Sequence, residues 1–270
     1  MNSNLKSLLQ NNPKIEIIEL ENSTKILKPW NDKSISFNFK KGKKLTDIQN
    51  LVFPEQLSAI NDIEKNELEF IYGPVDQDSK IKTREFDFLY KGQTFKCSFG
   101  KISNSLTTIA KSFKENETES QSDYRNLRFL RDVLSDDFYK DLFKDSFIAS
   151  FYIKGNFKNI NNDFVGLSKS LNFYMGYFDR DTPKILIHGK EQDEEAFKDP
   201  CLNELFDSFP KKINATNIDS TLLDTFMVAN QTESVRLKFI FYFQVLEYAS
   251  YYYLDKKIQS KILKTLNDPE

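Results

Sequence analysis

Two acidic and two basic side chains on either side of one turn are the first candidates for chemistry. Glu85 and Asp87 precede the turn at 91–93, and Lys96 and Lys101 follow it. Carboxylates that hold Mg²⁺, beside a lysine that orients a water molecule, can hydrolyse a phosphodiester bond. A Glu two positions before either lysine is missing, and these residues also suit the solvent face of an antiparallel sheet. A magnesium-dependent nuclease therefore remains an alternative to a plain surface.

Two groups of basic side chains could instead contact nucleic acid or another anion. The first group is a short loop that holds Lys40, Lys41, Lys43 and Lys44. The second group recurs at every third residue along one flank of an expected helix and holds Arg125, Arg128 and Arg131. Lysine and arginine contacts to phosphate supply affinity for nucleic acids. Short charge runs usually face water, and helix arginines pair with nearby carboxylates such as Asp132. A nucleic-acid-binding module is the second alternative.

His188, Cys97 and Cys201 are the remaining side chains that could act as a base, nucleophile or metal ligand. His188 is expected at a strand end before a glycine, with no nucleophile at a recognisable spacing. Neither cysteine has the second cysteine that a zinc site needs, and Cys97 falls on an apolar face, where cysteine packs as a small hydrophobe. The glycine patterns of phosphate-binding loops are absent. We therefore predict no catalytic residue, no metal and no cofactor.

The overall composition narrows the class of protein. The chain has 270 residues, a formal net charge of −2 and 39% hydrophobic residues, with 25 Phe and 12 Tyr. Such a composition is typical of a globular protein, and the near-neutral charge gives no global attraction to nucleic acid or membranes. The first residues lack a signal-peptide pattern and no long apolar run follows. With only 2 Cys, we expect a cytoplasmic protein without membrane contact.

Hydrophobic periodicity indicates the elements that position these side chains. Between residues 84 and 101, Phe86, Phe88, Phe95 and Phe99 alternate with polar residues, which predicts a hairpin with one aromatic face buried. Further strands are expected at 15–20, 34–40, 68–72, 147–153 and 184–188. Helices are expected at 102–113, 124–143 (broken near 135–137), 219–228 and 232–263. The segment 163–178 fits either a helix or a strand.

These elements predict an α+β fold, with a β-rich domain at 1–113 and a mainly helical domain at 123–270 that holds one or two short strands. The polar stretch at 114–122 is the expected linker.

The segment 235–254 is the most informative part of the chain because it is apolar nearly all round. A helix of this kind is either central in a bundle or part of an interface. Glu247 lies within it, and a buried glutamate needs a partner from outside its own helix. Tyr248, Tyr251 and Tyr252 add the amphipathic surface found at contact patches. We therefore expect Glu247 and these tyrosines to form an interface.

The aromatic stretch Phe243–Ala249, with Glu247 in it, resembles a helix of HEPN-type domains in bacterial defence and toxin proteins. The resemblance extends at most from Val235 to the last residue. That family's ribonuclease signature is an Arg and a His separated by a short polar spacer, whereas His188 lies upstream and follows Arg180 across Pro183. The resemblance thus implies a catalytically silent or incomplete domain whose apolar face is covered by a second chain.

Together these features predict a non-enzymatic interaction, sensor or scaffold subunit of an intracellular assembly. A protein partner or a homo-oligomer is expected, and nucleic acid remains a possible partner through the basic groups. The role in antiviral defence follows from the resemblance alone.

Overall fold

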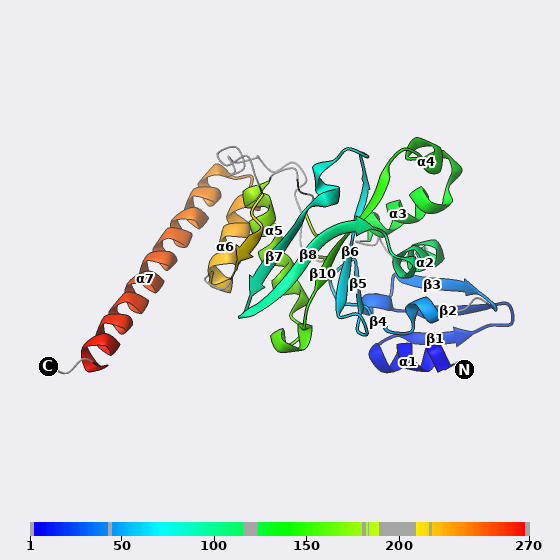
Figure 1. Cartoon of the computed structure of the whole chain (residues 1–270), viewed down its shortest axis with the longest axis horizontal. Coiled ribbons are helices and arrows are strands. Elements are labelled where there is room, and N and C mark those ends of the chain that lie inside the picture. Colours follow the sequence, from blue (N-terminus) through cyan, green and yellow to red (C-terminus); the bar gives the residue numbers. More distant parts are fainter. Residues whose placement is uncertain are drawn as a thin grey trace. The chain divides into compact units, whose positions relative to one another are not determined.

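The computed structural model describes residues 3–42, 45–115, 124–179, 182, 184–188, 209–215 and 218–267. The described residues fall into two compact units, the first ending at residue 215 and the second beginning at residue 218. The first unit holds the strands, and the second is helical (Figure 1). The predicted α+β class, with β-structure first and helices last, is confirmed.

A seven-stranded sheet forms the centre of the first unit. Its order is β11-β7-β8-β10-β6-β5-β4, and every pairing is antiparallel except that of β11 with β7. The strands are β4 (Leu51–Val52), β5 (Ala59–Asp62), β6 (Glu67–Val75), β7 (Glu85–Tyr90), β8 (Gln93–Lys101), β10 (Phe147–Lys154) and β11 (Lys212–Asn214). The predicted hairpin is β7–β8, with Phe88 opposite Phe95.

One face of this sheet is buried beneath helix α5 (Phe164–Phe178). Leu167, Leu171 and Met175 recur at the helical interval and pack against the aromatic side chains of the sheet. The Asp163 carboxylate accepts the Gly166 N–H at 3.0 Å and caps the first turn. This segment, for which the sequence allowed a helix or a strand, is therefore a helix.

A four-stranded sheet in the order β1-β2-β3-β9 carries the second core of the first unit. The Trp30 indole N–H donates to the Ala59 carbonyl at 2.7 Å, which ties this core to the larger sheet. The strands of this sheet are β1 (Glu16–Glu19), β2 (Ser23–Leu27), β3 (Ile35–Lys40) and β9 (Phe113–Glu115). Besides α5, the described helices of the first unit are α1 (Ser3–Asn11), α2 (Asn104–Ser112), α3 (Arg125–Ser135) and α4 (Asp137–Leu142). Short 3₁₀ turns lie at Pro29–Asn31, Thr46–Ile48, Lys80–Thr83 and Phe157–Ile160.

Two sequence-based expectations differ from the structure. β10 lies between β8 and β6, so the chain beyond residue 123 completes the first unit, and the structure divides near residue 216. The strand expected at 184–188 is wrong. Ile187 makes a single bridge to Leu57, and the side chain of Asn172 bonds both the N–H and the C=O of Ile185, at 2.7 and 2.8 Å. A side chain thus replaces the neighbouring strand.

The described part of the second unit holds helices α6 (Ser220–Gln231) and α7 (Val235–Asn267). Asp219 caps α6 by accepting the Thr221 N–H at 2.8 Å. The α6 helix has 12 residues and α7 has 33, so their lengths are about 18 and 50 Å. Among the described helices, none combines the length and apolar character that crossing a bilayer requires.

Candidate functional site

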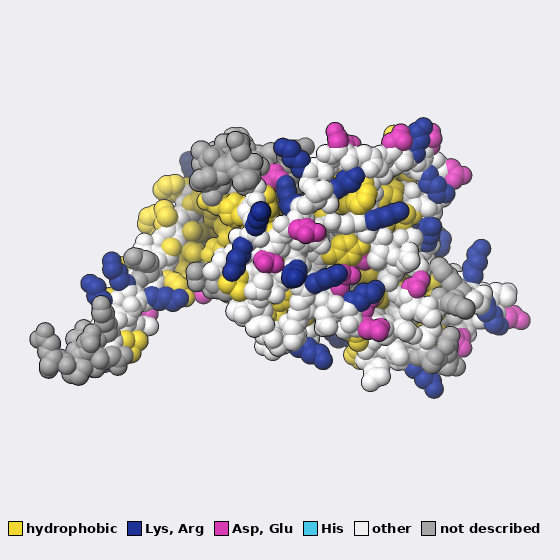
Figure 2. All heavy atoms as spheres, in the orientation of Figure 1, with side chains coloured by type: hydrophobic (Ala, Val, Ile, Leu, Met, Phe, Trp, Pro, Cys, Tyr) yellow, Lys and Arg dark blue, Asp and Glu magenta, His cyan; other side chains and the backbone are white. Residues whose placement is uncertain are grey.

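The charged residues of the β7–β8 hairpin lie on the face of the sheet opposite its aromatic core. Asp87 lies opposite Lys96 on one side and Lys212 on the other, and Glu85 lies opposite Ser98. Lys101 ends β8 and is exposed. Within the described ranges, no three His, Cys, Asp or Glu side chains gather as metal ligands. Figure 2 shows basic and acidic side chains interspersed on the first unit, which is the pattern of a solvent face.

The basic groups are only partly brought together. Lys40 ends β3 and Lys41 follows it, while Lys43 and Lys44 lie outside the described residues. On α3, Arg128 Nε donates to Glu115 Oε2 at 2.8 Å, and Arg131 pairs with Asp132 at 2.7 Å. Arg125 on the same helix is exposed. Carboxylates within the chain therefore already compensate much of the positive charge of Arg128 and Arg131 that an anion would bind.

His188 contacts a serine that sequence spacing did not reveal, because 130 residues separate them. His188 Nε2 lies 2.7 Å from Ser58 Oγ. The Ser58 hydroxyl donates to Asn126 Oδ1 at 2.8 Å, and the same oxygen accepts the Leu127 N–H at 2.9 Å. With the Ser58 proton directed to Asn126, the tautomer that fits both contacts carries its proton on Nε2 and donates it to Ser58. In this tautomer the imidazole does not accept the Ser58 proton, and Ser58 is only 3% exposed.

Cys97 is buried in the aromatic face of the hairpin. Burial, with a smaller contribution from Asp87, raises the pKa of its thiol well above the usual value. A thiol held protonated in this way is a poor nucleophile and metal ligand. Cys201 lies outside the described residues.

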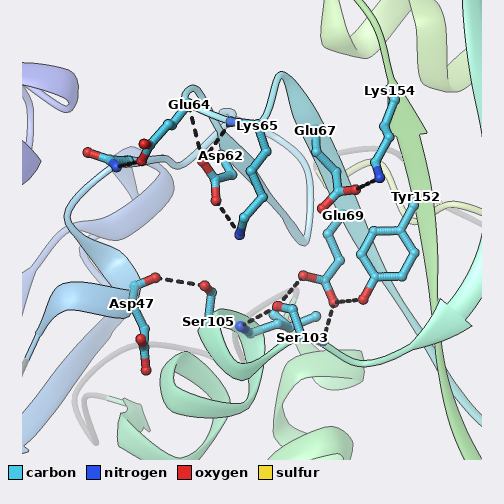
Figure 3. Close-up of polar contacts among 12 residues, drawn as sticks. Asp47, Asp62, Glu64, Lys65, Glu67, Glu69, Ser103, Ser105, Tyr152 and Lys154 are labelled. Carbon is cyan, nitrogen blue, oxygen red and sulfur yellow. Dashed lines mark hydrogen bonds and ion pairs between the residues drawn. The ribbon is translucent and has the colours of Figure 1, made fainter.

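Glu69 on β6 is a buried carboxyl group and is 3% exposed (Figure 3). Its Oε1 accepts the Ser103 N–H at 2.9 Å, and its Oε2 accepts the Ser103 hydroxyl. The Tyr152 hydroxyl is 3.0 Å from Oε1 and 2.5 Å from the Lys101 carbonyl oxygen. Burial raises the pKa of Glu69, and the hydrogen bonds from Ser103 oppose that shift.

The position of Glu69 is structural. Ser103 also accepts the Leu106 N–H at 3.0 Å and thereby caps α2, so the carboxyl group fixes this helix to β6 and β10. Glu69 was not among the candidate residues predicted from the sequence, although it is the one acidic residue of the strand expected at 68–72.

Helix α7 presents the largest exposed apolar surface of the second unit. Val235 is 81% exposed, Phe239 71%, Phe243 56%, Leu246 67% and Leu254 54%. At about 100° per residue, these five side chains fall within an arc of about 100° on one side of the helix. We call Val235, Phe239, Phe243, Leu246, Ser250 and Leu254 the α7 stripe. Figure 2 shows hydrophobic side chains at the surface of this unit.

Helix α6 contacts other faces of α7. The Tyr242 hydroxyl donates to Asn230, and the Tyr242 and Phe226 rings lie 5.9 Å apart. The Tyr248 hydroxyl donates to Asp219 at 3.1 Å. None of these α7 residues belongs to the stripe, and α6 is far shorter than α7. Among the described residues of the second unit, α6 therefore leaves the stripe uncovered, and its five apolar members are each more than half exposed.

The other residues predicted for an interface lie beside the stripe. Tyr251 is 71% exposed and Tyr252 38% exposed, and the Tyr252 ring stacks on Tyr248 with 6.4 Å between centroids. Glu247 is exposed, so the expectation that it is buried and needs a partner is wrong for the single chain. Most described side chains of α7 are exposed, whereas the sequence pattern suggested burial all round.

Comparisons with protein-family models, curated proteins and solved structures found no match to this chain. Among the described features of the chain, the α7 stripe is the one that neither fold nor core packing explains.

Proposed function

We propose that the protein is a non-enzymatic subunit of an assembly and that it docks through the α7 stripe. The observation that supports this function is the exposure of Val235, Phe239 and Phe243, each above half. Exposed apolar surfaces of this extent mark interaction sites in soluble proteins. The sensor or scaffold role, and the place in bacterial defence suggested by the resemblance to HEPN-type domains, belong to the same proposal.

Three catalytic or binding alternatives have less support from the contacts. The hairpin carboxylates Glu85 and Asp87 face out beside Ser98 and Lys96, and Arg128 and Arg131 are held by Glu115 and Asp132. The Ser58 hydroxyl proton is directed to Asn126 and not to His188, so this contact does not activate Ser58 as a nucleophile. A docking surface requires none of these groups.

A charge placed in the stripe tests the proposal. We expect the full chain to associate in light scattering, or to bind anilinonaphthalene sulfonate as a monomer, and Phe243→Glu to diminish that signal at least several-fold. Gln244→Glu is the matched control, because Gln244 is the exposed neighbour of Phe243 and lies off the stripe. Unchanged far-ultraviolet circular dichroism shows that both variants fold. A wild-type chain that neither associates nor binds the dye contradicts the proposal.

A further inference from the structure

The spacing of the α7 stripe is symmetric. Its members Val235, Phe239, Phe243, Leu246, Ser250 and Leu254 follow one another at steps of 4, 4, 3, 4 and 4 residues. Read from either end, the steps are the same, and the centre lies between Gln244 and Val245. A two-fold contact between identical helices needs this property, since residue i of one copy meets residue j of the other and the reverse.

We propose that the partner of the α7 stripe is a second copy of this chain, docked antiparallel about the 244–245 midpoint. The inference rests on the proposed function, because it names the occupant of the same surface. In this register, Val235 meets Leu254, Phe239 meets Ser250, and Phe243 meets Leu246. Each contact occurs twice, once on either side of the two-fold axis.

The side-chain sizes fit this pairing. The Phe239 ring, which is 71% exposed, falls over Ser250, the one small residue of the stripe. The Ser250 hydroxyl donates to the Leu246 carbonyl at 2.7 Å within its own helix, so burial beneath a ring leaves it satisfied. A large residue opposite a small one is the packing that lets two helices approach closely.

The apolar area that this face of α7 exposes is comparable to what one partner contributes to an interface of standard size. The five apolar members of the stripe are flanked by Ile240, Tyr251 and Ile258, which are 45%, 71% and 53% exposed. Eight such side chains, each offering on the order of 100 Å², amount to about 800 Å² per chain, which is what each partner contributes to an interface of standard size.

Charge favours the antiparallel orientation. Beyond Leu254, the direction of the stripe continues to Lys257 and Lys261. A parallel pair places each lysine against its own copy, which is unfavourable. The antiparallel pair separates the two sets of lysines by the length of the apolar contact and brings Lys256 and Lys257 to the end where Glu233 of the other copy lies, just before its α7 begins.

A size-swap experiment tests the register. The dissociation constant of the full-length dimer is measured by sedimentation for wild type, Phe239→Ser, Ser250→Phe and the double variant. We expect each single change to weaken association on the order of 10-fold, and the double variant to return to within about 3-fold of wild type, because it restores one ring opposite one serine. A different partner protein would not produce this compensation.

Disulfide trapping tests the orientation. In a Cys201→Ser background, chains carrying Val235→Cys are mixed with chains carrying Leu254→Cys. We expect oxidation to give the mixed dimer in preference to either like dimer, and an excess of like dimers would overturn the antiparallel arrangement.

The outcomes separate the inference from the function on which it rests. A chain that stays monomeric up to about 100 µM, yet binds the dye through the stripe, overturns self-pairing and leaves the docking function standing. A chain that is monomeric and binds no dye overturns both. Association without compensation in the double variant overturns the register.

Discussion

Ser103 donates both its backbone N–H and its hydroxyl proton to the carboxyl group of Glu69, one to each oxygen. Tyr152 reaches the same group, but its single proton is shared with the nearer Lys101 carbonyl. Burial raises the pKa of Glu69, while the hydrogen bonds that it accepts oppose that shift. The junction of β6, β10 and α2 therefore holds a buried carboxyl group whose pKa lies above its ordinary value.

Glu69 should make stability depend on pH. Because its folded pKa is above the ordinary value, the folded state binds more protons, and the free energy of unfolding falls as pH rises through the folded pKa. Glu69→Gln should flatten this dependence above about pH 4.5, the ordinary carboxyl pKa, in urea unfolding, by about 1.4 kcal/mol for each unit of pKa difference. Glu64→Gln, at an exposed site, is the control. Equal slopes for wild type and Glu69→Gln would contradict the prediction.

The Arg84–Asp179 ion pair should be a strong contributor to stability. Both side chains are 11% exposed, and the Arg84 guanidinium also donates to Thr182 at 2.6 Å and lies 4.4 Å from the Phe209 ring. Arg84→Ala leaves a buried carboxylate without its main partner, so we expect a loss of about 3 kcal/mol in denaturant unfolding.

Lys14→Ala is the comparison for this ion pair. It removes a pair with Glu55 whose side chains are 58% and 49% exposed, and it should cost less than about 1 kcal/mol. Similar losses in the free energy of unfolding for Arg84→Ala and Lys14→Ala would show that burial of the Arg84–Asp179 pair does not increase its contribution to stability.

Gly155 and Gly176 should respond in opposite directions to the same substitution. A Cβ on Gly155 would overlap the Phe95 ring, coming within 2.9 Å of its Cε1 atom, whereas a Cβ on Gly176 within α5 has no atom within 4 Å. We expect Gly155→Ala to lose about 1–3 kcal/mol through overpacking and Gly176→Ala to gain up to about 1 kcal/mol through helix propensity. Thermal unfolding of both variants measures the difference, and a stabilised Gly155→Ala protein would refute the close packing.

Ser58 should behave as a structural residue. Ser58→Ala removes the acceptor of His188 and the donor to Asn126, so we expect a loss of about 1–3 kcal/mol. A fluorophosphonate probe should leave the folded wild-type chain unmodified by intact mass. Rapid labelling at Ser58 would instead show that His188 takes up the serine proton.

The local pattern predicted elements well where one face is buried. Phe86, Phe88, Phe95 and Phe99 alternate, and this alternation alone was enough for the β7–β8 hairpin and its aromatic face. The α5 segment was ambiguous because Phe173, Met175 and Tyr177 fit a strand as well as a helix. Packing against the sheet decided between them.

Relationships between distant segments could not be predicted. The strand at 147–153 was expected, but its insertion between β8 and β6 depends on pairing with residues 48 to 87 positions earlier. The Ser58–His188 contact joins residues 130 apart in the sequence. For α7, Glu247 and the tyrosines were chosen by residue type, whereas the exposed stripe becomes visible only when the position of α6 is known.

The insertion of β10 between β6 and β8 has a consequence for the nascent chain. Until residues 147–154 emerge from the ribosome, β6 and β8 each have an open edge, and both edges carry apolar side chains. Open edges of this kind invite pairing between neighbouring nascent chains on one messenger RNA. Emergence of residues 147–154 therefore closes both edges, and a pause in translation before that point prolongs their exposure.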